Sequence, residues 1–157
     1  MDTLSVHIVR LDAMRVASTY GFGDSPEQEA WARMEAWASR MGFLDNPEAH
    51  PLFGLNNPYP TPEHPRYGYE YWMKVDPGVE PEGDVRIGEF FGGLYAVARC
   101  EALGHPESAI PSAWRALAEW CIANDHPRGT HVALEGFISS PDDAANLVMD
   151  LYCPIAR

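Results

Sequence analysis

The sequence predicts a single α+β domain built from two β-α-β-β units related by pseudo-twofold symmetry, with antiparallel strands. Three observations support this fold class. Segments rich in aromatic and β-branched residues alternate between apolar and polar positions, as in strands with one buried face. Two other segments carry apolar residues at helical spacing. The order of these elements occurs twice, offset by about 80 residues, which indicates an internal repeat.

The first half-repeat is expected over residues 14–76. Extended chain from Val6 to Tyr20 breaks at Asp12-Ala13, and Gly21-Phe22-Gly23 ends it. A helix then starts at Ser25 and Pro26, because serine suits the N-cap and proline the first helical position, and Gly42 terminates it. Two strands follow, at Leu52–Leu55 and Tyr67–Val75.

The second half-repeat is expected over residues 85–155. Its expected strands are Val85–Phe91, Leu94–Glu101, His131–Ile138 and Leu147–Ile155. Gly92-Gly93 is a hairpin signal between the first two of these strands. A second helix is expected over residues 112–124, with Ala113, Leu117 and Cys121 at helical spacing.

The two helices share the pattern Trp-x-x-apolar-x-x-Trp, in Trp31–Trp37 and again in Trp114–Trp120. In this register Glu70 corresponds to Asp150 and Trp72 to Tyr152. Each unit has to bury one sheet face under its helix. We therefore expect a central ligand cleft at the seam between the two units, where small molecules commonly bind.

The strand Tyr67–Val75 predicts two different faces. Tyr67, Tyr69, Tyr71 and Met73 form an apolar core face. The other face carries Glu70 and Trp72, which suits a pocket floor with a charge and an aromatic wall. The same pattern also fits a solvated sheet face with one exposed tryptophan. The strand alone leaves these two interpretations open.

Composition limits the function classes. The net charge of −12 and the lack of Lys/Arg runs argue against nucleic-acid binding. Neither a signal peptide nor an apolar run of membrane-spanning length is present, and the odd number of widely spaced cysteines fits reduced thiols. We therefore expect a cytoplasmic protein. We also expect a monomer or a weak dimer. The six histidines show no metal-site spacing, and no phosphate-loop or Gly-x-Ser-x-Gly motif occurs, so neither metal nor cofactor is expected.

Four segments carry a resemblance to a known family. They are Gly92–Val97, the helix with Trp114 and Trp120, Leu134–Phe137, and Asp150–Ile155. In this order and spacing the chain resembles the GyrI-like small-molecule-binding domain, which is also the effector-binding domain of AraC-type and MerR-type drug-responsive regulators. The resemblance implies an SHS2-type repeat fold over residues 1–157 in a stand-alone form, with no DNA-binding domain.

The resemblance also implies a site. The family's acid on the strand after the second helix maps to Glu135, at the floor of an aromatic cavity, and Phe137 stands where many members have tyrosine. Glu135 lies on an otherwise apolar strand, where an unpaired charge is costly. Desolvation beside aromatic rings favours the neutral carboxyl, which suits a general base, whereas an edge position facing water would give it no such role. The ligand-binding candidates are Glu135, Glu70, Trp72, Tyr152, Phe137, Tyr95 and Phe91, with Glu135 and Glu70 as the catalytic candidates.

Two function hypotheses follow. In the first, the chain binds small amphipathic or cationic aromatic compounds, as a drug-sequestering or sensing module. In the second, it hydrolyses electrophilic small molecules such as cyclopropanoid DNA-alkylating agents, as some stand-alone members of the family do, with Glu135 as the general base. Inhibition of a partner enzyme such as a gyrase is a third interpretation, by analogy with the family, and no residue in the sequence specifies it.

Because the chain is strongly acidic, we expect the purified protein not to shift duplex DNA at moderate salt in a gel mobility assay. A tight shift that weakens steeply with added salt would contradict this expectation.

Overall fold

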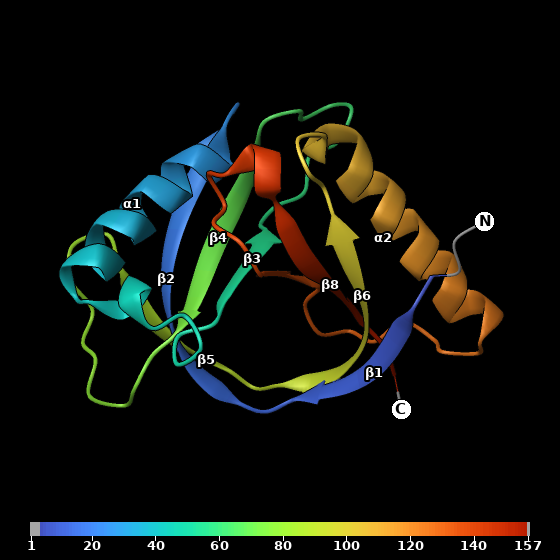
Figure 1. Cartoon of the computed structure of the whole chain (residues 1–157), viewed down its shortest axis with the longest axis horizontal. Coiled ribbons are helices and arrows are strands. Elements are labelled where there is room, and N and C mark those ends of the chain that lie inside the picture. Colours follow the sequence, from blue (N-terminus) through green and yellow to red (C-terminus); the bar gives the residue numbers. More distant parts are fainter. Residues whose placement is uncertain (1–3, 157) are drawn as a thin grey trace. The chain divides into compact units, whose positions relative to one another are not determined.

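The computed structural model describes residues 4–156 (Figure 1). The chain divides into two compact units. We call Met14–Phe90 the inserted unit, and Met1–Ala13 together with Phe91–Arg157 the flanking unit. The elements, in chain order, are β1 (Val6–Leu11), β2 (Met14–Gly23), α1 (Pro26–Arg40), a 3-10 turn (Phe43–Asp45), β3 (Leu52–Asn56), β4 (Tyr67–Lys74), β5 (Arg86–Phe90), β6 (Gly93–Glu101), α2 (Pro106–Ala123), β7 (Leu134–Phe137), a second 3-10 turn (Ala144–Asn146) and β8 (Val148–Pro154).

The inserted unit contains the succession β2-α1-β3-β4, followed by β5. Its strands lie in the order β3-β4-β2-β5, and all their pairings are antiparallel. Helix α1 packs on β2 and β4. Thr19 is buried on β2 and its hydroxyl donates a hydrogen bond of 2.8 Å to the carbonyl oxygen of Ala30, which fixes the helix to the strand.

The flanking unit repeats this succession as β6-α2-β7-β8, with β1 added. Its strands lie in the order β1-β6-β8-β7, again antiparallel throughout. Helix α2 packs on β6 and β8, and Leu117 and Leu151 are fully buried between helix and strands. The predicted α+β fold class with a duplicated β-α-β-β unit is thereby confirmed at the level of element order and strand pairing.

Corresponding positions of the two helices are buried alike. The apolar residue at the centre of each Trp-x-x-apolar-x-x-Trp pattern is Met34 in α1 and Leu117 in α2, and both side chains are fully buried.

The three cysteines form no disulfide and are buried. Neither α1 nor α2, the two α-helices of the described residues, is long and apolar enough to cross a membrane.

Two predictions about glycines were wrong. Strand β2 continues through Gly21 to Gly23, and Gly21 is needed because a Cβ there would collide with the carbonyl oxygen of Pro26, where α1 begins. Gly92-Gly93 closes no hairpin. Strand β5 pairs with β2 and β6 pairs with β1 and β8, so these glycines carry the chain from one unit into the other.

Element boundaries also differ in the second half. Helix α2 begins at Pro106, because proline at the first helical position and Glu107 in the first turn make a second start signal, and Pro111 lies inside the helix. Strand β7 covers only Leu134–Phe137, because residues 126–133 form a loop whose backbone bonds to the end of β8.

We predict that Leu117→Ala lowers the free energy of unfolding by about 2–5 kcal/mol, because it leaves a cavity in a fully buried site. Urea unfolding followed by circular dichroism measures this loss. Glu119→Ala, at an exposed position on the same helix, is the matched control and should change stability by less than about 0.5 kcal/mol. Equal losses for the two variants would contradict the packing of α2 described here.

Candidate functional site

Glu135 lies on the helix-covered face of the flanking unit. In the antiparallel register it is paired with Leu151 of β8, and directly opposed residues project to the same face of a sheet. Leu151 belongs to the core under α2, so Glu135 also points to the α2 side. There the indole Nε1 of Trp114 donates a hydrogen bond of 3.1 Å to Oε2 of Glu135.

The surroundings of Glu135 are mostly apolar. Phe137 lies two residues further on the same face, opposite Met149, and packs on the core cluster. Burial, then the negative charge of Glu135, raises the pKa of the nearby Cys100 thiol. A half-buried carboxylate held by an indole N–H and set beside aromatic rings can attract a cation or accept a proton from a bound water.

Tyr95 and Tyr152 occupy the opposite face of the same sheet. Tyr152 is the neighbour of Leu151 in β8, and successive strand residues alternate faces, so Tyr152 points away from Glu135. Its ring meets Tyr95 edge to face, with centroids 5.7 Å apart. Burial raises the pKa of both phenols. From the sequence we expect Tyr152 near Glu135 in the cleft, but the strand register places the two side chains on opposite faces of the sheet.

Two other ligand-binding candidates, Tyr95 and Phe91, differ in their exposure. Tyr95 is completely buried, and its hydroxyl donates a hydrogen bond of 2.6 Å to the carbonyl oxygen of Val132, so it serves the core. Phe91 follows β5 and is 87% exposed. A side chain so exposed contributes little to enclosing a ligand within its own unit.

Glu70 and Trp72 lie together on β4 of the inserted unit, as the strand pattern predicted. Tyr71, between them, contacts Trp31 of α1, so Glu70 and Trp72 face away from that helix. The indole Nε1 of Trp72 donates to Oε1 of Glu70 at 3.1 Å, and Nδ2 of Asn57 donates to Oε2 at 2.6 Å.

The surroundings of this second carboxylate are polar. Glu70 lines a cavity of 460 Å³ together with Tyr20, Asp84 and two arginines, Arg33 and Arg86. The ring of Trp72, on the same strand as Glu70, lies 5.8 Å from the ring of Phe90 on β5. Glu70 and Glu135 are thus two different kinds of site. Glu70 shares its cavity with charges of both signs, whereas Glu135 lies among apolar side chains.

An aromatic cluster lies under α1, on the face that corresponds to that of Glu135. The ring of Tyr71 lies 5.5 Å from Trp31 and 5.2 Å from Tyr69. The indole N–H of Trp31 is buried and has no hydrogen-bond acceptor among the described residues. Gly54 is paired with Tyr71 as Glu135 is with Leu151, and a Cβ at Gly54 would collide with the Tyr69 hydroxyl. A tyrosine hydroxyl thus occupies the space beside Gly54 in this unit.

Sequence reasoning missed the contact of Trp114 with Glu135, and Trp114 is not among the site residues expected from the sequence. Trp114 and Glu135 are 21 positions apart, on a helix and a strand, so no local pattern joins them. Their pairing depends on the register of β7 against β8. Among residues 4–156 there is no group of three His, Cys, Asp or Glu side chains arranged to hold a metal ion.

A family model for the GyrI-like small molecule binding domain matches residues 4–156. No curated protein sequence shows significant similarity to the chain. Among solved structures, the C-terminal domain of EcmrR is 15% identical, with a TM-score of 0.71 and 98% of each chain covered. The chain spans 57% of the EcmrR chain solved in its complex with DNA.

Two further solved structures have the same fold. SAV2435, bound to tetraphenylphosphonium, is 10% identical, with a TM-score of 0.58 over 98% of this chain and 94% of that one. A hydrolase from Listeria innocua is 11% identical, with a TM-score of 0.67 over 99% of this chain and 94% of that one. At such low identities the likeness shows a common fold.

We predict that Trp114 and Glu135 are energetically coupled. A double-mutant cycle with Trp114→Phe and Glu135→Met, measured by urea unfolding, should give a coupling free energy of about 1.5–3 kcal/mol, as expected for a hydrogen bond to a charged group. The pair Arg99–Asp150, joined at 2.6 Å on the more exposed face of the same unit, is the comparison and should give about 0.2–1 kcal/mol. A Trp114–Glu135 coupling near zero would show that the bond contributes nothing in solution.

Proposed function

The chain belongs to the GyrI-like family of small-molecule-binding domains, and we propose that it binds amphipathic aromatic compounds, cationic ones above all, at Glu135. The observation that carries this proposal is the hydrogen bond from Trp114 to Glu135 on the helix-covered face. It presents a carboxylate in a fixed orientation and next to an aromatic ring, the two groups that recognise an aromatic organic cation.

Electrostatics favours cations as ligands. A half-buried carboxylate is costly unless it is compensated, and a bound cation compensates it in addition to the indole N–H. The net charge of −12 also raises the local concentration of cations around the protein. The similar protein SAV2435 was solved with tetraphenylphosphonium, a cation of this kind.

The biological role that fits such a site is sequestration or sensing of toxic compounds. Broad apolar and aromatic surroundings with a single charge recognise a class of compounds more than one exact structure. The three buried, unpaired cysteines support a reducing compartment such as the cytoplasm.

We predict that tetraphenylphosphonium binds the wild-type protein and that Glu135→Gln weakens the binding roughly tenfold or more, because the amide keeps the shape and removes the charge. Isothermal titration calorimetry measures both dissociation constants. Triphenylphosphine oxide, a neutral compound of similar form, should bind more weakly to the wild type and should respond little to the substitution.

The controls separate the site from the overall charge. Glu119→Gln removes one exposed charge from α2 and should leave tetraphenylphosphonium binding unchanged. Glu70→Gln tests the polar cavity of the inserted unit in the same way. If Glu70→Gln weakens binding and Glu135→Gln does not, the proposed site is wrong and Glu70 replaces Glu135.

Hydrolysis of strained electrophiles is the second candidate function. It is supported by the hydrogen bond that orients the Glu135 carboxylate, a group able to accept a proton from water, and by the similarity to the Listeria innocua hydrolase. In this reaction a water oxygen attacks a cyclopropane carbon while Glu135 takes the proton of the water. The ring C–C bond breaks, and its electron pair moves to the conjugated carbonyl, which is then protonated. Relief of ring strain supplies driving force, so one positioned base is sufficient.

We predict that, if the chain is a hydrolase, Glu135→Gln lowers the turnover of a cyclopropyl-indole alkylating agent roughly 10²–10⁴-fold, the scale for losing one positioned proton acceptor. Chromatography of the ring-opened product measures the rate. A wild-type rate equal to that in buffer would eliminate this second function and leave the binding proposal intact. A Glu135→Gln variant with the wild-type rate would remove Glu135 from the catalytic role.

A further inference from the structure

A second cavity lies in the flanking unit and has a different character. It has a volume of 320 Å³ and opens between β1, the start of β6 and the loop that leads to β7. Arg10 and Arg128 line it from two sides, together with His131, and no Asp or Glu is among its lining residues. In a chain with a net charge of −12, a cavity bordered only by basic and neutral groups is unexpected.

Among the described residues, the two arginines have no carboxylate partner. Arg33, Arg40 and Arg99 each form an ion pair. Within residues 4–156, by contrast, no carboxylate lies within 4.0 Å of the guanidinium group of Arg10 or Arg128. Two guanidinium groups that border one cavity repel each other, and a bound anion would relieve this repulsion.

Both arginines are on well-fixed backbone. Arg10 is paired with Leu94 in the ladder between β1 and β6. Arg128 forms a β-bridge with Ile155, and the next residue, Gly129, donates its N–H to the carbonyl oxygen of Pro154 at 3.0 Å. The two charges are therefore attached to positions that strand pairing holds in place.

The imidazole of His131 forms a rigid part of the wall. Its Nε2 lies 2.8 Å from the carbonyl oxygen of Leu94, so this nitrogen carries the proton and donates it. The ring meets Tyr95 edge to face at 4.8 Å. It fits between two glycines, because a Cβ at Gly93 or at Gly129 would approach the ring carbons to 2.5 Å. The His131 ring therefore fits only because Gly93 and Gly129 have no side chain.

We propose that this cavity is a second ligand site, which binds small molecules that carry a phosphate or carboxylate group. Arg10 and Arg128 would hold the oxyanion, because planar guanidinium groups match its oxygens in paired hydrogen bonds. The volume is at the lower end of the range for ligand pockets, which suits a small ester or acid. Neither Glu135 nor Trp114 lines the cavity, so this site does not depend on the function proposed for Glu135.

The test is a titration of the ¹⁵N-labelled protein with inorganic phosphate, phenyl phosphate and benzoate at constant ionic strength, with chloride as the reference anion. We expect saturable shifts of the amide signals of Gly93, Gly129 and Thr130, with a dissociation constant of ~1 mM or tighter for the best ligand. Arg10→Ala and Arg128→Ala should each weaken binding roughly tenfold. The stronger of the phosphate and benzoate arms identifies the preferred oxyanion.

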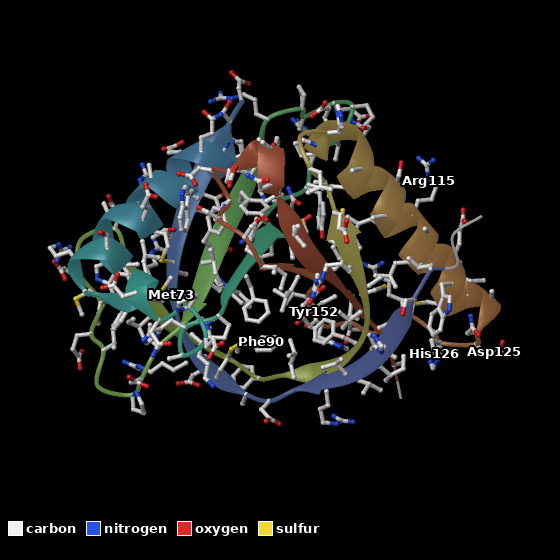
Figure 2. All side chains as sticks on the ribbon, viewed as in Figure 1. Met73, Phe90, Arg115, Asp125, His126 and Tyr152 are labelled. Atoms are coloured by element: carbon white, nitrogen blue, oxygen red, sulfur yellow. The ribbon has the colours of Figure 1, made fainter. Side chains whose placement is uncertain are left out.

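Arg115→Ala is the matched control, because Arg115 is exposed on α2 and does not line the cavity (Figure 2). It removes the same charge from the same unit and should leave the titration unchanged. Gly129→Ala keeps both arginines but displaces His131, and should weaken binding while the protein stays folded by circular dichroism. Shifts that do not saturate with any of the three anions, or that persist in the Arg10→Ala/Arg128→Ala double variant, would overturn the proposal.

Discussion

Alternation of side chains along the central strands is the constraint on which both units depend. In β4, Tyr71 and Met73 are buried toward α1 while Glu70 and Trp72 project to the other face. In β8, Leu151 is buried under α2 and Tyr152 projects away. A shift of one residue in either strand would exchange these faces. Strand register therefore decides which side chains surround each carboxylate.

The two units have the same order of elements but carry different side chains at corresponding positions of the helix-covered face. In the flanking unit the helix-covered face carries a carboxylate, Glu135, bonded to the indole of α2. In the inserted unit the matching pair position is Gly54, and the phenol of Tyr69 takes the adjacent space, under an indole whose N–H finds no acceptor among the described residues. Duplication thus supplies one charged and one purely aromatic version of the same surface.

The features that could be predicted from the sequence were the local ones. Helical spacing around Met34 and Leu117 predicted both helices, and period-2 alternation predicted which face of β4 is buried. The errors arose where distant segments decide the outcome. Gly21 serves the close approach of α1, and the partner of Glu135 is set by the pairing of β7 with β8. The internal repeat aligned Tyr152 with Trp72. It did not indicate on which face of the sheet Glu135 lies, because that depends on the pairing of Glu135 with Leu151.

The nested arrangement of the units has a consequence for biosynthesis. The pairings of β2 with β4 and β5, and of β3 with β4, all lie within Met14–Phe90, so a nascent chain can form them as soon as β5 has left the ribosome. Strand β1 is made first, yet its partner β6 follows only after the whole inserted unit. During that interval β1 is an unpaired strand with open hydrogen-bonding groups, the kind of segment that recruits wrong partners. Translation that is slow through the inserted unit would prolong this exposure, and a chaperone bound to residues 6–11 would cover the segment during the interval.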